Sequence, residues 1–159
     1  VPDLRLIIVG GFPEEQKNYF RSVNNFIEKE NLTERVRILG YQKDPLKILK
    51  CMDFYISSSL SEGLPISILE ASASGIPIIA TEIPGNKDIL LNSVFGVLVE
   101  PDSPKSLVQG IVKMIQLTQN ERTIITQNAS NRVKNYFSIE EMVRKTDLLY
   151  KQVLNNNSI

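Results

Sequence analysis

The chain has 159 residues, of which 42% are hydrophobic and 23% charged, a composition typical of one globular domain and not of a disordered or membrane-spanning segment. Eighteen basic residues balance eighteen acidic ones, and a net charge of zero argues against a nucleic-acid-binding protein. A single cysteine, Cys51, excludes an internal disulfide framework, and the absence of histidine excludes Ser-His-Asp triads, Cys-His dyads and His-ligated metals. Any chemistry must therefore use carboxylates, hydroxyls, backbone amides or a cofactor.

Short apolar runs bounded by glycine, proline or polar residues predict strands. Five are expected, at 4–11 (closed by two glycines), 36–40, 53–57, 76–81 and 95–99. Helices are expected between the first four strands, each with a proline at or just before its start. They cover 14–30, 45–51 and 65–75. After residue 100 three further helices are expected, beginning near Pro104, at 121–136 and at 138–154, the last opened by a capping box at Ser138.

Strands that alternate with helices predict an α/β fold. We expect a Rossmann-like parallel sheet of about five strands with helices on both faces, followed by the C-terminal helices. Residues 1–154 are interpreted as a single domain and 155–159 as a frayed tail. Because a strand begins within a few residues of the start, the chain is interpreted as a fragment of a longer protein.

No targeting segment is predicted, because the charged first residues lead into a short apolar run that lacks a signal-peptide pattern. We therefore expect a cytoplasmic protein. Peripheral contact of the longer protein with a membrane stays open, although the sequence shows no basic amphipathic helix that would support it.

Ligands bind such sheets at the carboxyl ends of the strands. The segment after the third strand is the most informative, because Glu62 and Gly63 precede a helix whose first amides point into that crevice and favour an anion. Glu70 is the only charged residue between Gly63 and Thr81, in a helix of otherwise apolar or small residues that is expected to be buried. A buried carboxylate needs hydrogen-bond donors, and a ribose diol would supply two. Alternatively, Glu70 caps a backbone amide or pairs with a lysine, and Glu62 is a solvated loop charge.

The pattern around these residues is longer than a pair of carboxylates. A strand is followed by S-x-x-S-E-G-L-P and then by I-L-E-A-x-A-x-G-x-P-I-I-A-T, with Glu62 and Glu70 separated by seven residues. This pattern resembles the retaining glycosyltransferases of group 1 (family 4-like), which have the two-domain GT-B architecture. The resemblance covers nearly the whole chain and also includes residues 6–11, 36–40, 84–86 with Asp88, 95–101 and 137–138. It implies that the chain is the C-terminal, donor-binding half of such an enzyme.

The resemblance implies a role for each matching residue of the segment 62–70, the helix-start segment. Glu62 would be the catalytic candidate and would contact hydroxyls of the donor sugar near the reacting carbon. Glu70 would bind the ribose hydroxyls of the nucleotide. The backbone around Gly63, Leu64 and Pro65 would contact the sugar and the diphosphate, although Pro65 has no amide hydrogen to donate.

Four further residues are implied as nucleotide-sugar contacts near the first two strands. Gly10 and Gly11 would line the crevice near the phosphates. The backbone at Gly40 and Tyr41 would meet the nucleobase. For Gly40 a simple strand-end turn is an equal alternative, and an exposed Tyr41 needs no functional explanation.

The implied reaction replaces a nucleoside diphosphate at an anomeric carbon with retained configuration, through a transition state like an oxocarbenium ion. No Asp-x-Asp motif occurs, and the resemblance implies neither a metal nor a cofactor. A UDP-sugar is expected as the donor, with GDP-mannose second, and the acceptor, a sugar or lipid-linked glycan, would bind the missing N-terminal half. The family's phosphate-binding Arg and Lys are absent here, so we expect this fragment to bind nucleotide weakly and to be inactive alone.

The alternative function is a non-catalytic sugar-nucleotide-binding or scaffold module on the same fold. A dinucleotide-binding dehydrogenase is disfavoured because 10–13 lack the Gly-x-Gly-x-x-Gly motif. A signalling receiver domain is disfavoured because no acidic residue ends the first strand. Many relatives carry Glu where this chain has Asp88, whose role stays open.

Overall fold

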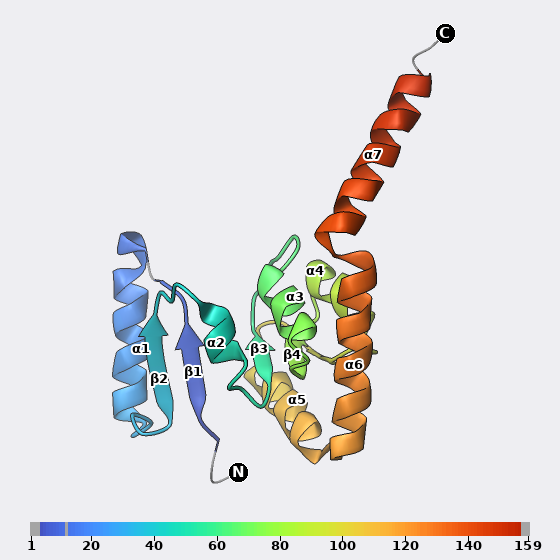
Figure 1. The fold of residues 1–159 in the computed structure, drawn as a ribbon. Coiled ribbons are helices and arrows are strands. Elements are labelled where there is room, and N and C mark those ends of the chain that lie inside the picture. Colours follow the sequence, from blue (N-terminus) through green and yellow to red (C-terminus); the bar gives the residue numbers. More distant parts are fainter. Residues whose placement is uncertain (1–3, 12, 157–159) are drawn as a thin grey trace. The chain divides into compact units, whose positions relative to one another are not determined.

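A computed structural model describes residues 4–11 and 13–156. The chain forms two compact units, Val1–Ile48 and Leu49–Ile159. Figure 1 shows both units, and each is described by itself. Whether they form the single domain expected for residues 1–154 stays a prediction.

The first unit contains a parallel pair of strands, β1 (Leu6–Val9) and β2 (Val36–Gly40), with Leu6 opposite Val36. Between them the chain forms the 3-10 turn η1 (Glu14–Gln16) and helix α1 (Lys17–Lys29), which follow Pro13 as predicted. Helix α2 (Pro45–Leu49) begins in this unit, and its first residue is the expected proline. Strand β1 was expected to be buried, and this is wrong for most of it: Leu6, Ile7 and Val9 are exposed and only Ile8 is half-buried in this two-stranded sheet. Leu6 is 44% exposed and Val9 40%.

The second unit contains three parallel strands in the order β3-β4-β5, and β4 lies in the middle. The strands are β3 (Tyr55–Ser57), β4 (Ile78–Thr81) and β5 (Val97–Val99). Helices α3 (Ile66–Ala73) and α4 (Pro84–Leu90) follow β3 and β4. Helices α5 (Pro104–Gln116), α6 (Gln119–Tyr136) and α7 (Ile139–Asn156) complete the chain. The α/β class is confirmed, but the five strands form two sheets of two and three strands instead of one.

Both faces of the three-stranded sheet are covered, as predicted. All four residues of β4 are buried, and its first three alternate between two hydrophobic clusters. Ile78 and Ala80 pack with residues of α3, α4 and α6, whereas Ile79 packs with β5 and with Met114 of α5. A β-carbon at Gly110 of α5 would lie 2.5 Å from Cγ1 of Val99, so a glycine is needed for this close helix–sheet approach.

The three C-terminal helices begin with side-chain caps. In α5 the Ser103 hydroxyl accepts a hydrogen bond from the Ser106 amide (3.2 Å), and in α6 Thr118 and Glu121 form a capping box that the sequence analysis missed. At α7 only half of the expected capping box is present. The Ser138 hydroxyl accepts from the Glu141 amide (3.2 Å), but the Glu141 carboxylate binds Arg144 instead of the cap.

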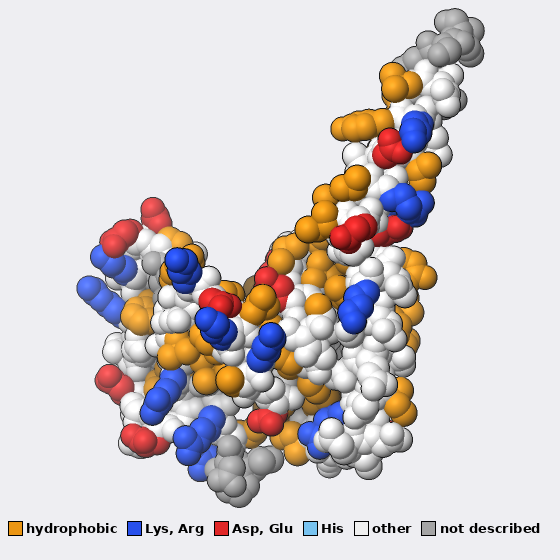
Figure 2. Space-filling view, in the orientation of Figure 1, with side chains coloured by type: hydrophobic (Ala, Val, Ile, Leu, Met, Phe, Trp, Pro, Cys, Tyr) orange, Lys and Arg blue, Asp and Glu red, His pale blue; other side chains and the backbone are white. Residues whose placement is uncertain are grey.

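Two further differences concern helix bounds. Helix α4 was not predicted, because its Gly85 and Asn86 are poor helix formers and its start follows β4 by only two residues. Helix α7 continues through Asn156, so the part of the expected frayed tail at 155–156 is helical, and residues 157–159 lie outside the described residues. Exposed hydrophobic side chains run along α7 (Figure 2). Across the described part of the chain, none of the helices is both long and apolar enough to cross a membrane.

Candidate functional site

The carboxyl ends of β3, β4 and β5 lie at one edge of the three-stranded sheet, because the strands are parallel. The chain leaves β3 at Ser57 and passes through the loop 58–65 into α3. It leaves β4 at Thr81 and enters α4 at Pro84. This topology places the loop residues Glu62–Pro65 at that edge, as the sequence predicts.

The loop that carries Glu62 packs directly on the first turn of α4. A β-carbon at Gly85 would lie 2.5 Å from the Gly63 carbonyl oxygen and 2.8 Å from that of Glu62. Such distances leave no room for a side chain, so Gly85 is required for the loop to approach the helix this closely. The Ser59 hydroxyl donates a hydrogen bond to Oε1 of Glu62 (2.9 Å), within the same loop.

Helix α3 presents one open stripe and one buried face. Ile68, Leu69, Ala71 and Ser72 are buried, whereas Ile66 is 58% exposed and Glu70 is half-buried on the open side. The expectation that this helix is buried all round is therefore wrong. The sequence of α3 shows no polar face opposite an apolar one, because the open stripe also carries apolar and small residues.

Within the described residues, Glu70 has neither the backbone amide nor the lysine partner that the alternative interpretation requires, whereas the exposure of Glu62 fits the alternative of a solvated loop charge. Among residues 4–11 and 13–156, Glu70 forms no salt bridge and its carboxylate accepts no hydrogen bond. Glu62 is exposed and accepts only the bond from Ser59 in that part of the chain. The helix-start segment thus carries two carboxylates, Glu62 and Glu70, that have no cationic partner among the described residues.

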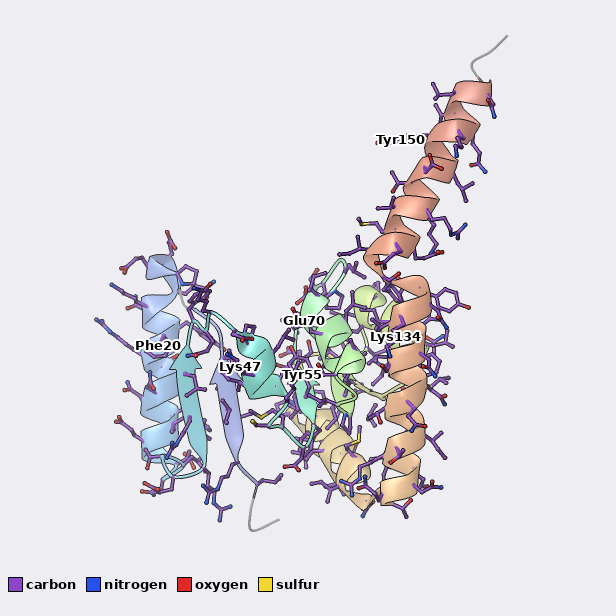
Figure 3. All side chains as sticks on the ribbon, viewed as in Figure 1. Phe20, Lys47, Tyr55, Glu70, Lys134 and Tyr150 are labelled. Carbon is purple, nitrogen blue, oxygen red and sulfur yellow. The ribbon has the colours of Figure 1, made fainter. Side chains whose placement is uncertain are left out.

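Tyr55 of β3 lies within the electrostatic influence of both glutamates. Burial raises the pKa of the Tyr55 phenol, a side-chain hydrogen bond with Ser67 opposes this shift, and the charges of Glu62 and Glu70 raise the pKa further. Both carboxylates therefore act on the same phenol oxygen. Figure 3 shows Glu70 on α3 and Tyr55 on β3. The sequence analysis missed Tyr55 and Ser67, because an aromatic residue in an apolar strand is typical of core packing.

The start of α3 has open backbone. Its N-cap residue, Pro65, provides no side-chain cap, and the Pro65 carbonyl accepts hydrogen bonds from the amides of Ile68 (3.1 Å) and Leu69 (3.3 Å). Gly63 and Leu64 are exposed, whereas Pro65 is buried. A β-carbon at Gly63 would meet nothing within 4 Å, and Gly63 is not among the glycines with positive φ. Among the described residues, therefore, neither side-chain packing nor backbone conformation requires a glycine at position 63.

In the first unit, the four predicted residues near the strand ends lie together. The Gly10 amide donates a hydrogen bond to the Gly40 carbonyl (3.0 Å), where β1 and β2 end. A β-carbon at Gly11 would lie 3.7 Å from Cβ of Tyr41. Gly40 has φ +67°, which favours glycine, and Tyr41 is 78% exposed. The positive φ of Gly40 at the end of β2 fits the alternative of a strand-end turn, and a contact of this group with a nucleobase stays a prediction.

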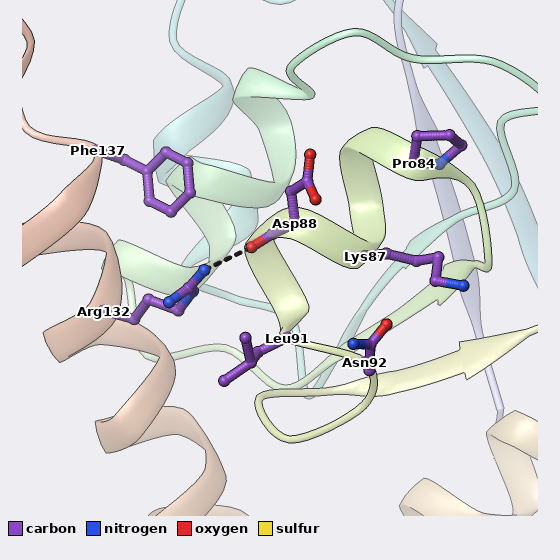
Figure 4. A pocket seen from close by; sticks show the side chains of 7 residues that line it. All are labelled: Pro84, Lys87, Asp88, Leu91, Asn92, Arg132 and Phe137. Atoms are coloured by element: carbon purple, nitrogen blue, oxygen red, sulfur yellow. Dashed lines mark hydrogen bonds between the residues drawn. The ribbon is translucent and has the colours of Figure 1, made fainter.

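A separate hollow of about 530 Å³ lies between α4 and the end of α6 (Figure 4). It is lined by Pro84, Lys87, Asp88, Leu91, Asn92, Arg132 and Phe137, and by none of the predicted binding residues. Arg132 donates hydrogen bonds to the carbonyls of Asp88 (2.7 Å) and Ile89 (3.0 Å) near the end of α4. Three aromatic rings surround its guanidinium, so its role in the described structure is to hold α4 against α6.

Comparisons with known proteins agree with this architecture. Residues 1–132 match the family described as "Glycosyl transferases group 1". The chain is 32% identical over 156 residues to the Escherichia coli UDP-Gal:alpha-D-GlcNAc-diphosphoundecaprenol alpha-1,3-galactosyltransferase, a match that covers 98% of this chain and 39% of that protein. The chain thus spans about two fifths of the length of this relative.

Solved structures show the same fold. A glycosyltransferase from Rickettsia africae matches with a TM-score of 0.89 and 29% identity, over 98% of this chain and 41% of that chain. The Anabaena protein HepE, solved in complex with UDP, matches with a TM-score of 0.89 over 96% of this chain and 42% of that chain. Its identity of 24% supports the fold alone.

Proposed function

The chain belongs to the group 1 glycosyltransferases, and from this premise we propose that the helix-start segment of its second unit binds a nucleoside-diphosphate sugar. The observation that carries the proposal is geometric: Glu62 lies in the loop at the carboxyl edge of the three-stranded sheet, and Glu70 lies on the open side of the helix that this loop leads into. Both carboxylates act on the Tyr55 phenol, and neither has a cationic partner among the described residues. Carboxylates in this state can accept hydrogen bonds from ligand hydroxyls.

In the proposed complex, Glu70 accepts hydrogen bonds from the ribose hydroxyls and Glu62 from hydroxyls of the donor sugar. The diphosphate lies at the start of α3, where the amides lack a side-chain cap and the helix dipole favours negative charge. The open space at Gly63 gives the ligand room to approach the backbone.

The proposed reaction retains the configuration of the anomeric carbon, and it uses no metal. Negative charge grows on the leaving diphosphate as the sugar acquires oxocarbenium character, and backbone amides directed at that charge stabilise the transition state. The protein's contribution is therefore mainly electrostatic. The enzyme as a whole would transfer the sugar to a sugar or lipid-linked acceptor, bound outside the part of the protein described here.

UDP is the proposed nucleotide. The Escherichia coli relative is named for a UDP-galactose donor and a lipid-diphosphate-linked acceptor, which supports UDP over GDP for this chain. GDP-mannose is the second choice.

The test measures the melting temperature of the 159-residue chain with UDP, GDP and ADP. With nucleotide at about ten times its Kd, the stabilisation is about 1.4 kcal/mol, which raises Tm by about 3–6 °C. Glu70→Ala should abolish most of this shift, whereas the control Glu140→Ala, on the exposed first turn of α7, should retain it. Failure of all three nucleotides to shift Tm at millimolar concentration would contradict the proposal.

A further inference from the structure

Two buried polar residues, Thr81 and Asn86, form a chain of hydrogen bonds, the Thr81–Asn86 relay, that reaches the loop carrying Glu62. Thr81, the last residue of β4, is 3% exposed, and its hydroxyl donates a hydrogen bond to the Ser59 carbonyl. Asn86 of α4 is fully buried and donates from Nδ2 to the Thr81 carbonyl (2.8 Å) and to the Thr81 hydroxyl oxygen (3.2 Å). The relay therefore runs from α4 through the end of β4 to the loop.

The direction of each hydrogen bond follows from the chemistry of the groups. The Asn86 amide can only donate from Nδ2, so the Thr81 oxygen accepts on that side and its single proton is free for the Ser59 carbonyl. Oδ1 of Asn86 is buried without a hydrogen-bond partner among the described residues. An unpartnered buried acceptor is costly, so packing alone does not explain an asparagine here.

The relay ends at Glu62. The carbonyl of Ser59 is held by Thr81, and the hydroxyl of the same residue donates to the Glu62 carboxylate (2.9 Å). On the other side, Gly85 supports the carbonyls of Glu62 and Gly63. The Ser59–Gly63 segment of the loop is thus held at one end by Thr81, the last residue of β4, and approached closely at the other by Gly85 of α4.

We propose that Thr81 and Asn86 are positioning residues that fix the Glu62 carboxylate for the donor sugar, without touching the ligand themselves. This inference rests on the proposed function, because it takes Glu62 as the group that contacts the sugar. It assigns to Thr81 and Asn86 the positioning of Glu62, which contacts the sugar, and leaves the nucleotide contacts at Glu70 unaffected. A merely structural role of the relay would instead weaken UDP and UDP-sugar binding equally.

The test compares Thr81→Val, which removes the hydroxyl at nearly constant volume, with Thr81→Ser, which keeps it. Binding of UDP, UDP-galactose, UDP-glucose and UDP-N-acetylglucosamine to the 159-residue chain is measured by NMR titration. Backbone ¹⁵N order parameters of residues 59–63 are measured without ligand, so the loop is tested independently of any binding. If Thr81→Val does not fold, Asn86→Ala takes its place in the same measurements.

We expect order parameters of about 0.85 in the wild type and in Thr81→Ser, and a fall to about 0.6 in Thr81→Val. The Kd for the best UDP-sugar should rise about tenfold in Thr81→Val and stay within about twofold in Thr81→Ser, while the Kd for UDP stays within about twofold in both. Unchanged order parameters, or equal weakening of UDP and UDP-sugar, would overturn the positioning role. A third outcome is that the wild-type loop is rigid and becomes mobile in Thr81→Val, but no nucleotide binds to any variant. This outcome would overturn the proposed function and show that the relay only stabilises the loop.

Discussion

Gly63→Ala should raise the stability of the chain and lower its affinity for nucleotide sugar. A new β-carbon there would meet nothing within 4 Å, and Gly63 is not a positive-φ glycine. Replacing glycine by alanine at a compatible position reduces the entropy of the unfolded chain and stabilises by ~0.4–1 kcal/mol. For a chain of this size, Tm should rise by about 1–4 °C.

The affinity should change in the opposite direction. A methyl group at Gly63 would occupy the space through which the diphosphate approaches the first amides of α3. Losing one hydrogen bond to a charged group costs about 1.5–3 kcal/mol, which corresponds to a Kd roughly 10- to 150-fold higher. Calorimetric unfolding gives the stability, and NMR titration with UDP and UDP-galactose gives the affinity of the same samples.

Gly85→Ala provides the contrast, because its β-carbon would lie 2.5 Å from the Gly63 carbonyl oxygen. This variant should be destabilised by about 1–3 kcal/mol, as expected for overpacking. If Gly63→Ala binds nucleotide sugar as tightly as the wild type, the diphosphate does not lie at the start of α3, and the placement proposed for it fails.

Three further predictions concern the stability and charges of the second unit. Gly110→Ala should destabilise by about 1–3 kcal/mol in urea unfolding, because its β-carbon would lie 2.5 Å from Cγ1 of Val99; an unchanged midpoint would contradict the close approach. Arg132→Ala should cost about 2–4 kcal/mol, since it removes two charged hydrogen bonds and the ring contacts, whereas a loss below about 0.5 kcal/mol would mean that Arg132 does not hold α4. The hydrogen bond with Arg144 lowers the pKa of Glu141 to about 2, so its contribution to stability is present above the usual glutamate pKa and is lost as the pH falls through about 2. NMR titration of the Glu141 carboxyl should show this midpoint, and in Arg144→Gln it should move toward the usual value.

The strand and helix order could be predicted because local signals specify it. Prolines mark the starts of α2 and α5, and Gly75, with φ +72°, follows α3 as a helix-ending glycine. Helix faces were less certain. In α1 the buried residue is Ile27, whereas the adjacent hydrophobic residue, Phe26, is 59% exposed. One step of 100° separates these two positions, and only the packed structure distinguishes them.

The pair of glutamates could be identified from the sequence, because their spacing and neighbours form a long pattern. Their surroundings could not. Tyr55 is read as a core residue in a strand, and nothing local indicates that its phenol lies within the influence of two carboxylates. Asn86 was part of the resemblance, but its donor function toward Thr81 depends on the path of α4, which the sequence analysis treated as loop.

Residues at the edge of the second unit therefore divide by how they act. Glu62, Glu70 and Gly63 are accessible and lack packing reasons for their identity, which is the expected condition of residues kept for a ligand. Thr81 and Asn86 are buried and hydrogen-bonded, yet their bonds end on the loop that presents the accessible group. A substitution of Glu62 or Glu70 should change binding at nearly constant stability, whereas a substitution of Thr81 or Asn86 should first change the order of the loop and, as a consequence, the recognition of the sugar.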